Sequence, residues 1–178
     1  LEVIDKYGAD ALRLTLITGN APGNDMRFYW ERVESSRNFA NKVWNASRFI
    51  LMNFEKAEIS EEIDKKYLTQ ADKWILSKMN TLIKDVTENM EKFELGIAVQ
   101  KIYDFIWEEA CDWYIEMVKP ILYNDEVETK AAALWTLNHV LITSLKLLHP
   151  YMPFITEDIF CTLQNKEESI MVSDWPVY

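Results

Sequence analysis

The chain has 178 residues, 49% of them hydrophobic, which is enough to bury the core of one domain. Its net charge of −10 argues against a protein that holds nucleic acid by bulk electrostatics. Two isolated cysteines exclude a disulfide framework, and the absence of a signal peptide or a run of about 18 apolar residues indicates a soluble, cytoplasmic protein without a membrane partner.

The first 27 residues are expected to form a helix followed by a loop. Residues 2–17 place apolar side chains near helical spacing, and Asp10 and Arg13 stand where their charges can pair. Gly8 weakens this helix only mildly. Residues 18–25 are rich in turn-forming residues. Because the chain does not begin with Met and a helix starts at once, we expect a segment of a longer protein.

Residues 31–53 are predicted to form a long helix with two different faces. At about 100° per residue, one continuous face is apolar and consists of Val33, Phe39, Ala40, Val43, Ala46, Ile50 and Leu51. The opposite face is polar and consists of Arg37, Asn38, Asn41, Asn45 and Arg48. Phe49 lies on the outward side, and Trp44 lies at the border. Asn is a poor helix former, so a use for these amides is expected.

The residue types on this polar face match unpaired bases and phosphates. Asn offers a donor and an acceptor, Arg a planar fork of donors, and Phe a flat stacking surface. All five arginines lie in residues 1–53, whereas the remainder is strongly acidic, which favours a few shaped contacts over non-specific phosphate binding. The alternative is a buried helix whose polar residues bond to neighbouring helices.

The rest of the chain continues as helices with short connections. A surface loop (54–66) is followed by a helix that a Thr69–Asp72 capping box opens and that ends near residue 92. The next helix covers residues 98–123, and Pro120 kinks or ends it. After a polar turn (124–128) we expect a central buried helix (131–148), a short helix from residue 153 and an extended tail.

Three carboxylates, Glu108, Asp112 and Glu116, recur at every fourth residue of one helix, and Lys119 extends this acidic row. They repel one another unless cations meet them. We expect a structural ion network whose cations are arginines from residues 31–53 or lysines from a neighbouring helix. A carboxylate-bridged metal site would need Glu-x-x-His pairs, and none occurs.

No glycine-rich phosphate loop, nucleophile elbow or metal-ligand cluster is present, so we expect no catalytic or metal-binding residue. Several segments instead carry a family resemblance: YGADALR (7–13), APGND (21–25), RNFANKVWNASRF (37–49), EACDWYIE (109–116), LLHPYMPFITE (147–157) and WP (175–176). Together they resemble the C-terminal helical domain of the class I aminoacyl-tRNA synthetases. The 37–49 segment is most similar to the valyl members, and isoleucyl or leucyl members and a helical docking module remain alternatives.

The resemblance implies an all-α fold, a helical bundle of about five to six helices forming one anticodon-binding domain. Residues 1–27 would be the junction from a catalytic domain, residues 28–165 the bundle and residues 166–178 an extended tail. The implied partners are valine tRNA and that catalytic domain, with no DNA. ATP and magnesium would belong to the parent enzyme, whose two ATP-handling signatures are not in this chain, so the fragment would be inactive and would hold no cofactor.

The tRNA-binding residues implied by the resemblance lie mainly on the polar face. They are Arg37, Asn41, Asn45, Arg48 and Phe49, with Trp113 and Ile115 as outer candidates. Asp10 and Arg13 are expected to be structural and to fix the first helix against the catalytic domain.

Overall fold

The computed structural model describes residues 1–18, 25–54, 63–163 and 169–178, and these contain helices and no strand. The helices are α1 (Glu2–Tyr7), α2 (Ala9–Ile17), α3 (Trp30–Phe54), α4 (Gln70–Glu91), α5 (Leu95–Asp104), the π-helix η2 (Phe105–Tyr114), α6 (Ile115–Leu122), α7 (Val127–Leu148) and α8 (Pro153–Leu163), with 3-10 turns η1 (Lys65–Tyr67) and η3 (Ile170–Val172). The predicted all-α bundle is confirmed.

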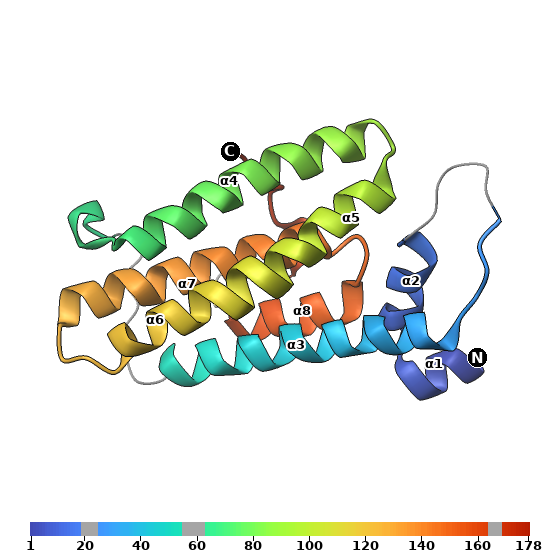
Figure 1. Cartoon of the computed structure of the whole chain (residues 1–178), viewed down its shortest axis with the longest axis horizontal. Coiled ribbons are helices and arrows are strands. Elements are labelled where there is room, and N and C mark those ends of the chain that lie inside the picture. Colours follow the sequence, from blue (N-terminus) through green and yellow to red (C-terminus); the bar gives the residue numbers. More distant parts are fainter. Residues whose placement is uncertain (19–24, 55–62, 164–168) are drawn as a thin grey trace.

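The long helices lie roughly side by side, and α1 and α2 lie together at one end (Figure 1). α5, η2 and α6 follow one another without a break and form a single rod. α7 is the central helix, because it packs on α3, α4, α6 and α8. It is long and apolar enough to cross a membrane, but 67% of its most apolar stretch is buried inside the bundle, as in the core helix of a soluble protein.

The N-terminal segment is two helices rather than one. Gly8 has φ of +88°, a conformation that favours glycine, and it separates α1 from α2. The prediction of one helix over residues 2–17 is therefore wrong at this point. Of the loop predicted over residues 18–25, positions 19–24 lie outside the described residues, as do positions 55–62 of the next loop and positions 166–168 of the tail.

Asp10 and Arg13 do not pair with each other but hold α2 to the corner between α7 and α8. The Asp10 carboxylate accepts hydrogen bonds from the backbone N–H groups of Phe154 at 3.3 Å and Ile155 at 2.8 Å, at the start of α8. Arg13 donates to the carbonyls of Pro150 at 3.0 Å and Tyr151 at 3.3 Å. Both residues are structural, and they fix α2 to the corner between α7 and α8 of the same domain.

We expect Asp10→Ala to lower the free energy of unfolding by about 1–2 kcal/mol, because two N–H groups at the start of α8 lose their acceptor. Urea unfolding followed by circular dichroism measures the loss. Asp5→Ala removes an exposed carboxylate from the neighbouring α1 and should change stability by less than about 0.5 kcal/mol. Equal losses for the two variants would contradict a capping role for Asp10.

The predicted capping box at the start of α4 is confirmed, and it reaches further than expected. Thr69 N–H donates to Asp72 Oδ2 at 2.7 Å, and Asp72 N–H donates to Thr69 Oγ1 at 3.2 Å. The other oxygen of the fully buried Asp72 accepts the Tyr114 hydroxyl at 2.5 Å. Burial and the neighbouring carboxylate raise the pKa of Tyr114 well above its usual value. This bond joins α4 to the end of η2.

Residues 169–178 lie against the bundle, as expected for the tail. Ile170 in η3 is buried, and its N–H donates to Glu157 of α8 at 3.2 Å. Beyond η3 the chain is extended, and Trp175 Nε1 donates to Thr87 Oγ1 of α4 at 2.9 Å.

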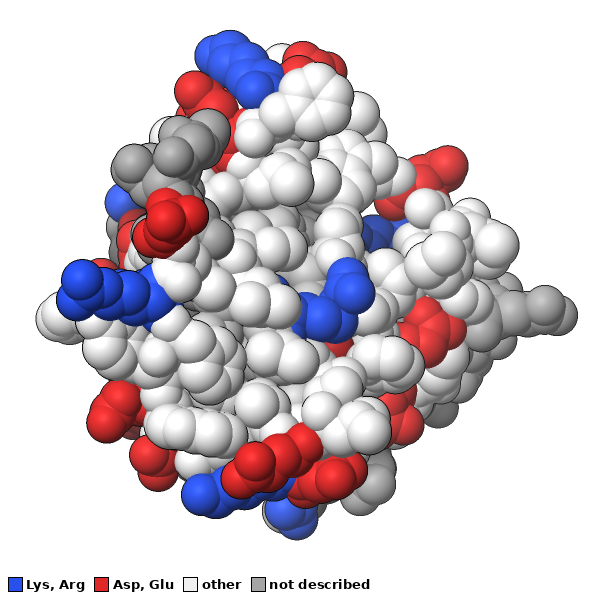
Figure 2. Space-filling model, turned by 90° about the vertical axis from the view of Figure 1, so that its right-hand side faces the viewer, with Lys and Arg blue, Asp and Glu red and all other residues white. Residues whose placement is uncertain are grey.

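The end of the molecule that carries α1 and α2 is largely uncharged, with charged residues mainly around its rim (Figure 2). α1, the start of α3, the corner between α4 and α5 and the start of α8 lie toward this end (Figure 1). We call the large exposed apolar side chains on or beside these segments the apolar end: Leu1, Ile4, Phe28, Trp30, Phe93, Ile97 and Phe154. Exposed apolar area of this kind marks an interaction surface.

Candidate nucleic-acid interface

The two predicted faces of α3 are both present in the structure. Its buried side consists of Val33, Ser36, Phe39, Val43, Ser47 and Ile50. Its polar face, which consists of Arg37, Asn38, Asn41, Asn45 and Arg48, is exposed along its whole length. The alternative of polar residues buried between helices is therefore wrong for this stripe.

The side chains of the polar face are free to bind a ligand. Within the described part of the chain, Asn41, Asn45 and Arg48 make no side-chain hydrogen bond or ion pair. Arg37 lies 5.9 Å from the Tyr7 ring centroid, a distance at the limit of a cation–π contact. Two guanidinium groups and three amides thus share one exposed helix face without competing protein partners.

Phe49 lies at the edge of this face and is only partly exposed. One side of the residue packs against the hydrophobic core, and Lys119 Nζ of α6 lies 5.8 Å from its ring centroid. The residue therefore presents part of a rigidly held ring rather than a freely projecting side chain, with the exposed Arg48 next to it.

Two of the three carboxylates in the acidic row, Asp112 and Glu116, form ion pairs, and their cations are lysines; Glu108 forms none within the described residues. Lys42 Nζ of α3 lies 2.6 Å from Asp112 Oδ1, and Lys119 Nζ lies 2.5 Å from Glu116 Oε1 on the same helix. One turn away, Lys78 of α4 pairs with Glu109 at 2.9 Å. No arginine joins these pairs within the described residues, so of the two kinds of cation that were expected, lysine is the one present.

A row of stacked aromatic rings sets the position of α3 beside the rod of α5, η2 and α6. Phe39 stacks on Tyr103 at 4.4 Å, and Tyr103 stacks on Trp107 at 5.6 Å between ring centroids. Lys42 Nζ lies 3.9 Å from the Trp107 centroid and ends the row at the surface. This packing brings Lys42 and the acidic row to the edge of the polar face.

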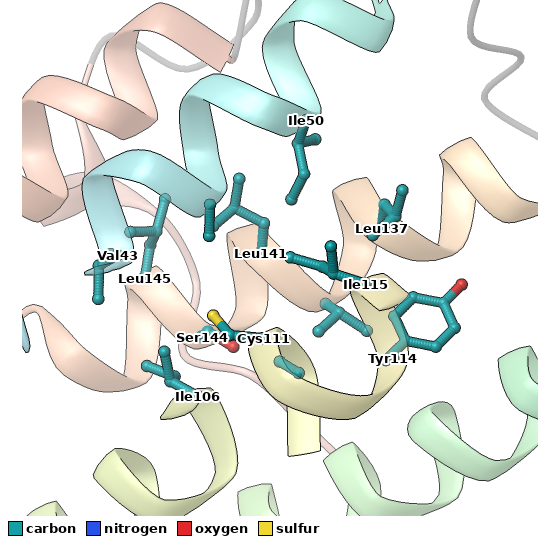
Figure 3. Close-up of a pocket in the computed structure, with 13 residues that line it drawn as sticks. Val43, Ile50, Ile106, Cys111, Tyr114, Ile115, Leu137, Leu141, Ser144 and Leu145 are labelled. Atoms are coloured by element: carbon teal, nitrogen blue, oxygen red, sulfur yellow. The ribbon is translucent and has the colours of Figure 1, made fainter. Parts of the chain in front are cut away.

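The two outer candidates occupy different environments. Trp113 on η2 is 63% exposed and accessible to a ligand. Ile115 is buried and lines a core cavity of about 30 Å³ between α3, η2 and α7, where it lies among Ile50, Leu137 and Leu141 (Figure 3). Of the predicted tRNA-binding residues, the four polar ones on α3 and Phe49 therefore lie together, and Trp113 lies on the adjacent rod. Ile115 does not reach the surface.

The same cavity contains the Cys111 thiol, whose pKa burial raises to about 11, partly offset by Lys42. The thiol is therefore protonated at neutral pH and poorly nucleophilic. The described residues hold no group of three or more His, Cys, Asp or Glu side chains that could bind a metal ion. The polar face thus offers side chains suited to recognition by hydrogen bonds and stacking.

Lys42 and Lys119 are the residues at this surface that the sequence did not single out as part of a site. In the sequence Lys42 stands between the residues of the polar face. Only its distance from Asp112 shows that it pairs with a carboxylate of the acidic row.

Comparison with known proteins gives one family and a consistent set of relatives. A family described as "Anticodon-binding domain of tRNA ligase" matches residues 72–178. Over all 178 residues the chain is 60% identical to a valine–tRNA ligase of Clostridium tetani and 59% identical to that of Clostridium perfringens. It spans 20% of the length of each of these relatives.

Two solved structures share the fold at low sequence identity. One is a ternary complex of Agrobacterium radiobacter LeuRS, tRNA and LeuAMS, with a TM-score of 0.72 and 18% identity, covering 99% of this chain and 21% of that one. The other is the free methionyl-tRNA synthetase of Mycobacterium tuberculosis, with a TM-score of 0.69 and 16% identity, covering 89% of this chain and 33% of that one.

Proposed function

Because the chain belongs to the family of anticodon-binding domains of tRNA ligases, we propose that it is the anticodon-binding domain of a valine–tRNA ligase and that the polar face of α3 contacts the anticodon loop. The observation that carries the proposal is the exposed stripe of amides and guanidiniums, which form no side-chain hydrogen bond or ion pair with the described residues. The 60% identity to a valine–tRNA ligase over the whole chain favours valine tRNA over leucine or isoleucine tRNA.

Each group on the polar face has a role in this proposal. Asn41 and Asn45 reach base edges, because an amide can pair with both donors and acceptors on a base. Arg48 and the exposed part of Phe49 flank one unpaired base, and Arg37 contacts a phosphate. Trp113 is a second stacking surface on the neighbouring rod. The burial of Ile115 gives no support to a contact with tRNA.

In the parent enzyme this domain would position tRNA for a catalytic domain that attaches valine with ATP and magnesium. The chain spans 20% of its relatives' length, so the catalytic domain would lie in the remainder. We place that domain on the apolar end, which lies beside the helices expected at the junction. The chain itself would have no catalytic activity and no cofactor, and it would act in the cytoplasm.

Arg48→Ala tests the role of the polar face. We expect valine tRNA to bind about fivefold more weakly, a loss of roughly 1 kcal/mol, because one charged contact is removed. Fluorescence anisotropy with labelled valine tRNA measures the change. Lys84→Ala removes an exposed positive charge from α4 and should leave binding almost unchanged. Equal affinity of Arg48→Ala and the unaltered chain would favour a docking role for this face.

Competition among tRNAs tests the identity of the ligand. Valine tRNA should displace the labelled probe better than the same tRNA with a substituted anticodon, and better than leucine or isoleucine tRNA. Preference for leucine or isoleucine tRNA would assign the chain to another class I synthetase. Equal competition by valine tRNA and its anticodon variant would overturn anticodon recognition.

A further inference from the structure

We propose that Asp112 and Glu116 restrain Lys42 and Lys119 so that RNA binding at this face depends on base contacts rather than on charge. The two carboxylates would then determine specificity without touching the RNA base. The inference about tRNA choice rests on the proposed function, whereas the inference about restraint rests on the ion pairs alone.

Four cations lie on or beside the polar face, and they fall into two kinds. Arg37 and Arg48 have no carboxylate partner among the described residues. Lys42 and Lys119 are each within 2.6 Å of a carboxylate oxygen. An arginine can read a base or phosphate through a directional fork, whereas a lysine is a point charge that binds any phosphate. The cations suited to shaped contacts are free, and the less selective ones are neutralised.

Lys42 is also held over an aromatic ring, whereas Lys119 lies at the limit of a cation–π contact with one. Lys42 Nζ lies 3.9 Å from the Trp107 centroid, and its side chain is 24% exposed. Lys119 Nζ lies 5.8 Å from the centroid of Phe49, the ring proposed to stack on a base. The carboxylate holds each ammonium group beside α6 or η2, and the Trp107 ring adds a second restraint on Lys42.

Beyond stabilising the two ion pairs, Asp112 and Glu116 would therefore prevent Lys42 and Lys119 from binding RNA phosphates. Removing their charge leaves two lysines beside the polar face that can neutralise RNA phosphates. Each phosphate neutralised on a single strand steepens the salt dependence of binding by about 0.7 in a plot of log K against log salt. Specificity falls when this sequence-independent term grows, because it strengthens binding to every RNA.

The test uses the double variant D112N/E116Q, which keeps the shape of both side chains and removes their charge. Binding is measured against poly(U), valine tRNA and its anticodon variant between about 0.05 and 0.3 M salt, the range in which phosphate contacts are screened. We expect tighter poly(U) binding with a slope steeper by up to about 1.4, from two freed lysines. We also expect a smaller affinity ratio between valine tRNA and its anticodon variant.

A matched control removes the same amount of charge without breaking either ion pair. Glu108 and Glu128 are exposed, and neither forms a salt bridge within the described residues, so E108Q/E128Q changes the net charge equally without freeing a lysine. Its salt slope should equal that of the unaltered chain. Adding K42M and K119M to the D112N/E116Q variant should return the slope to the original value.

The salt dependence of poly(U) binding is sufficient to test whether the carboxylates restrain the two lysines. An unchanged slope in D112N/E116Q, or an equal increase in E108Q/E128Q, would overturn the proposal. If the unaltered chain does not distinguish valine tRNA from its anticodon variant, the proposed function fails, and with it the role of these carboxylates in tRNA choice, whatever the poly(U) result.

Discussion

Asp72→Ala is expected to destabilise the chain by about 3–4 kcal/mol, the largest effect of any single substitution proposed here. The fully buried carboxylate accepts from Thr69 N–H and the Thr69 hydroxyl through one oxygen, and from the Tyr114 hydroxyl through the other. Alanine removes the cap, at roughly 1 kcal/mol, and leaves a buried phenol without its charged acceptor, at roughly 2 kcal/mol more.

Urea unfolding of Asp72→Ala measures this loss as a lower midpoint at an unchanged slope. Asp64→Ala is the matched control, because Asp64 also caps a helical turn but is exposed. Its loss should stay below about 0.5 kcal/mol. Tyr114→Phe separates the two components, since it removes the cross-helix bond and leaves the capping box intact. A loss for Asp72→Ala no larger than that for Asp64→Ala would show that the buried bonds contribute little.

Phe49→Ala is expected to weaken valine tRNA binding by about 1–3 kcal/mol if a base stacks on the ring. The ring is held by the core on one side and lies near Lys119 on the other, so its position is fixed before RNA arrives. A fixed ring binds without an ordering penalty, so we expect Phe49→Ala to weaken binding more than Arg48→Ala, because the Arg48 side chain is exposed and is not held by a described residue.

Phe49→Leu separates stacking from packing. Leucine keeps most of the apolar contact with the core but has no flat face, so it should lose nearly as much tRNA affinity as alanine while losing less stability. Phe154→Ala removes an exposed ring at the far end of the molecule and serves as the control for non-specific effects. Unaltered tRNA affinity in Phe49→Leu would exclude stacking on this ring.

The sequence predicted those features that depend on local spacing. The exposed polar face and buried apolar face of α3 follow from a period of 3.6 residues, and the cap of α4 follows from Thr69 and Asp72 standing three residues apart. The family resemblance came from short segments that keep their order along the chain. These signals are read within one element, so they do not require knowledge of how helices pack.

The features that the sequence did not predict depend on contacts between distant residues or on backbone geometry. Asp10 caps a helix 144 residues away, and Lys42 pairs with a carboxylate 70 residues away. The π-helix over Phe105–Tyr114 carries an apolar pattern that fits an α-helix about as well, and Gly8 marks a break only because its φ is positive.

The apolar end has a consequence for the colloidal behaviour of the chain. With a net charge of −10, molecules at low salt repel one another and keep their apolar ends apart. Salt shortens the range of that repulsion to about 10 Å at 0.1 M, so apolar contact between copies becomes easier as ionic strength rises. Added salt would therefore have opposite effects on two associations, because it would weaken the proposed contact with tRNA and favour contact between copies of the chain.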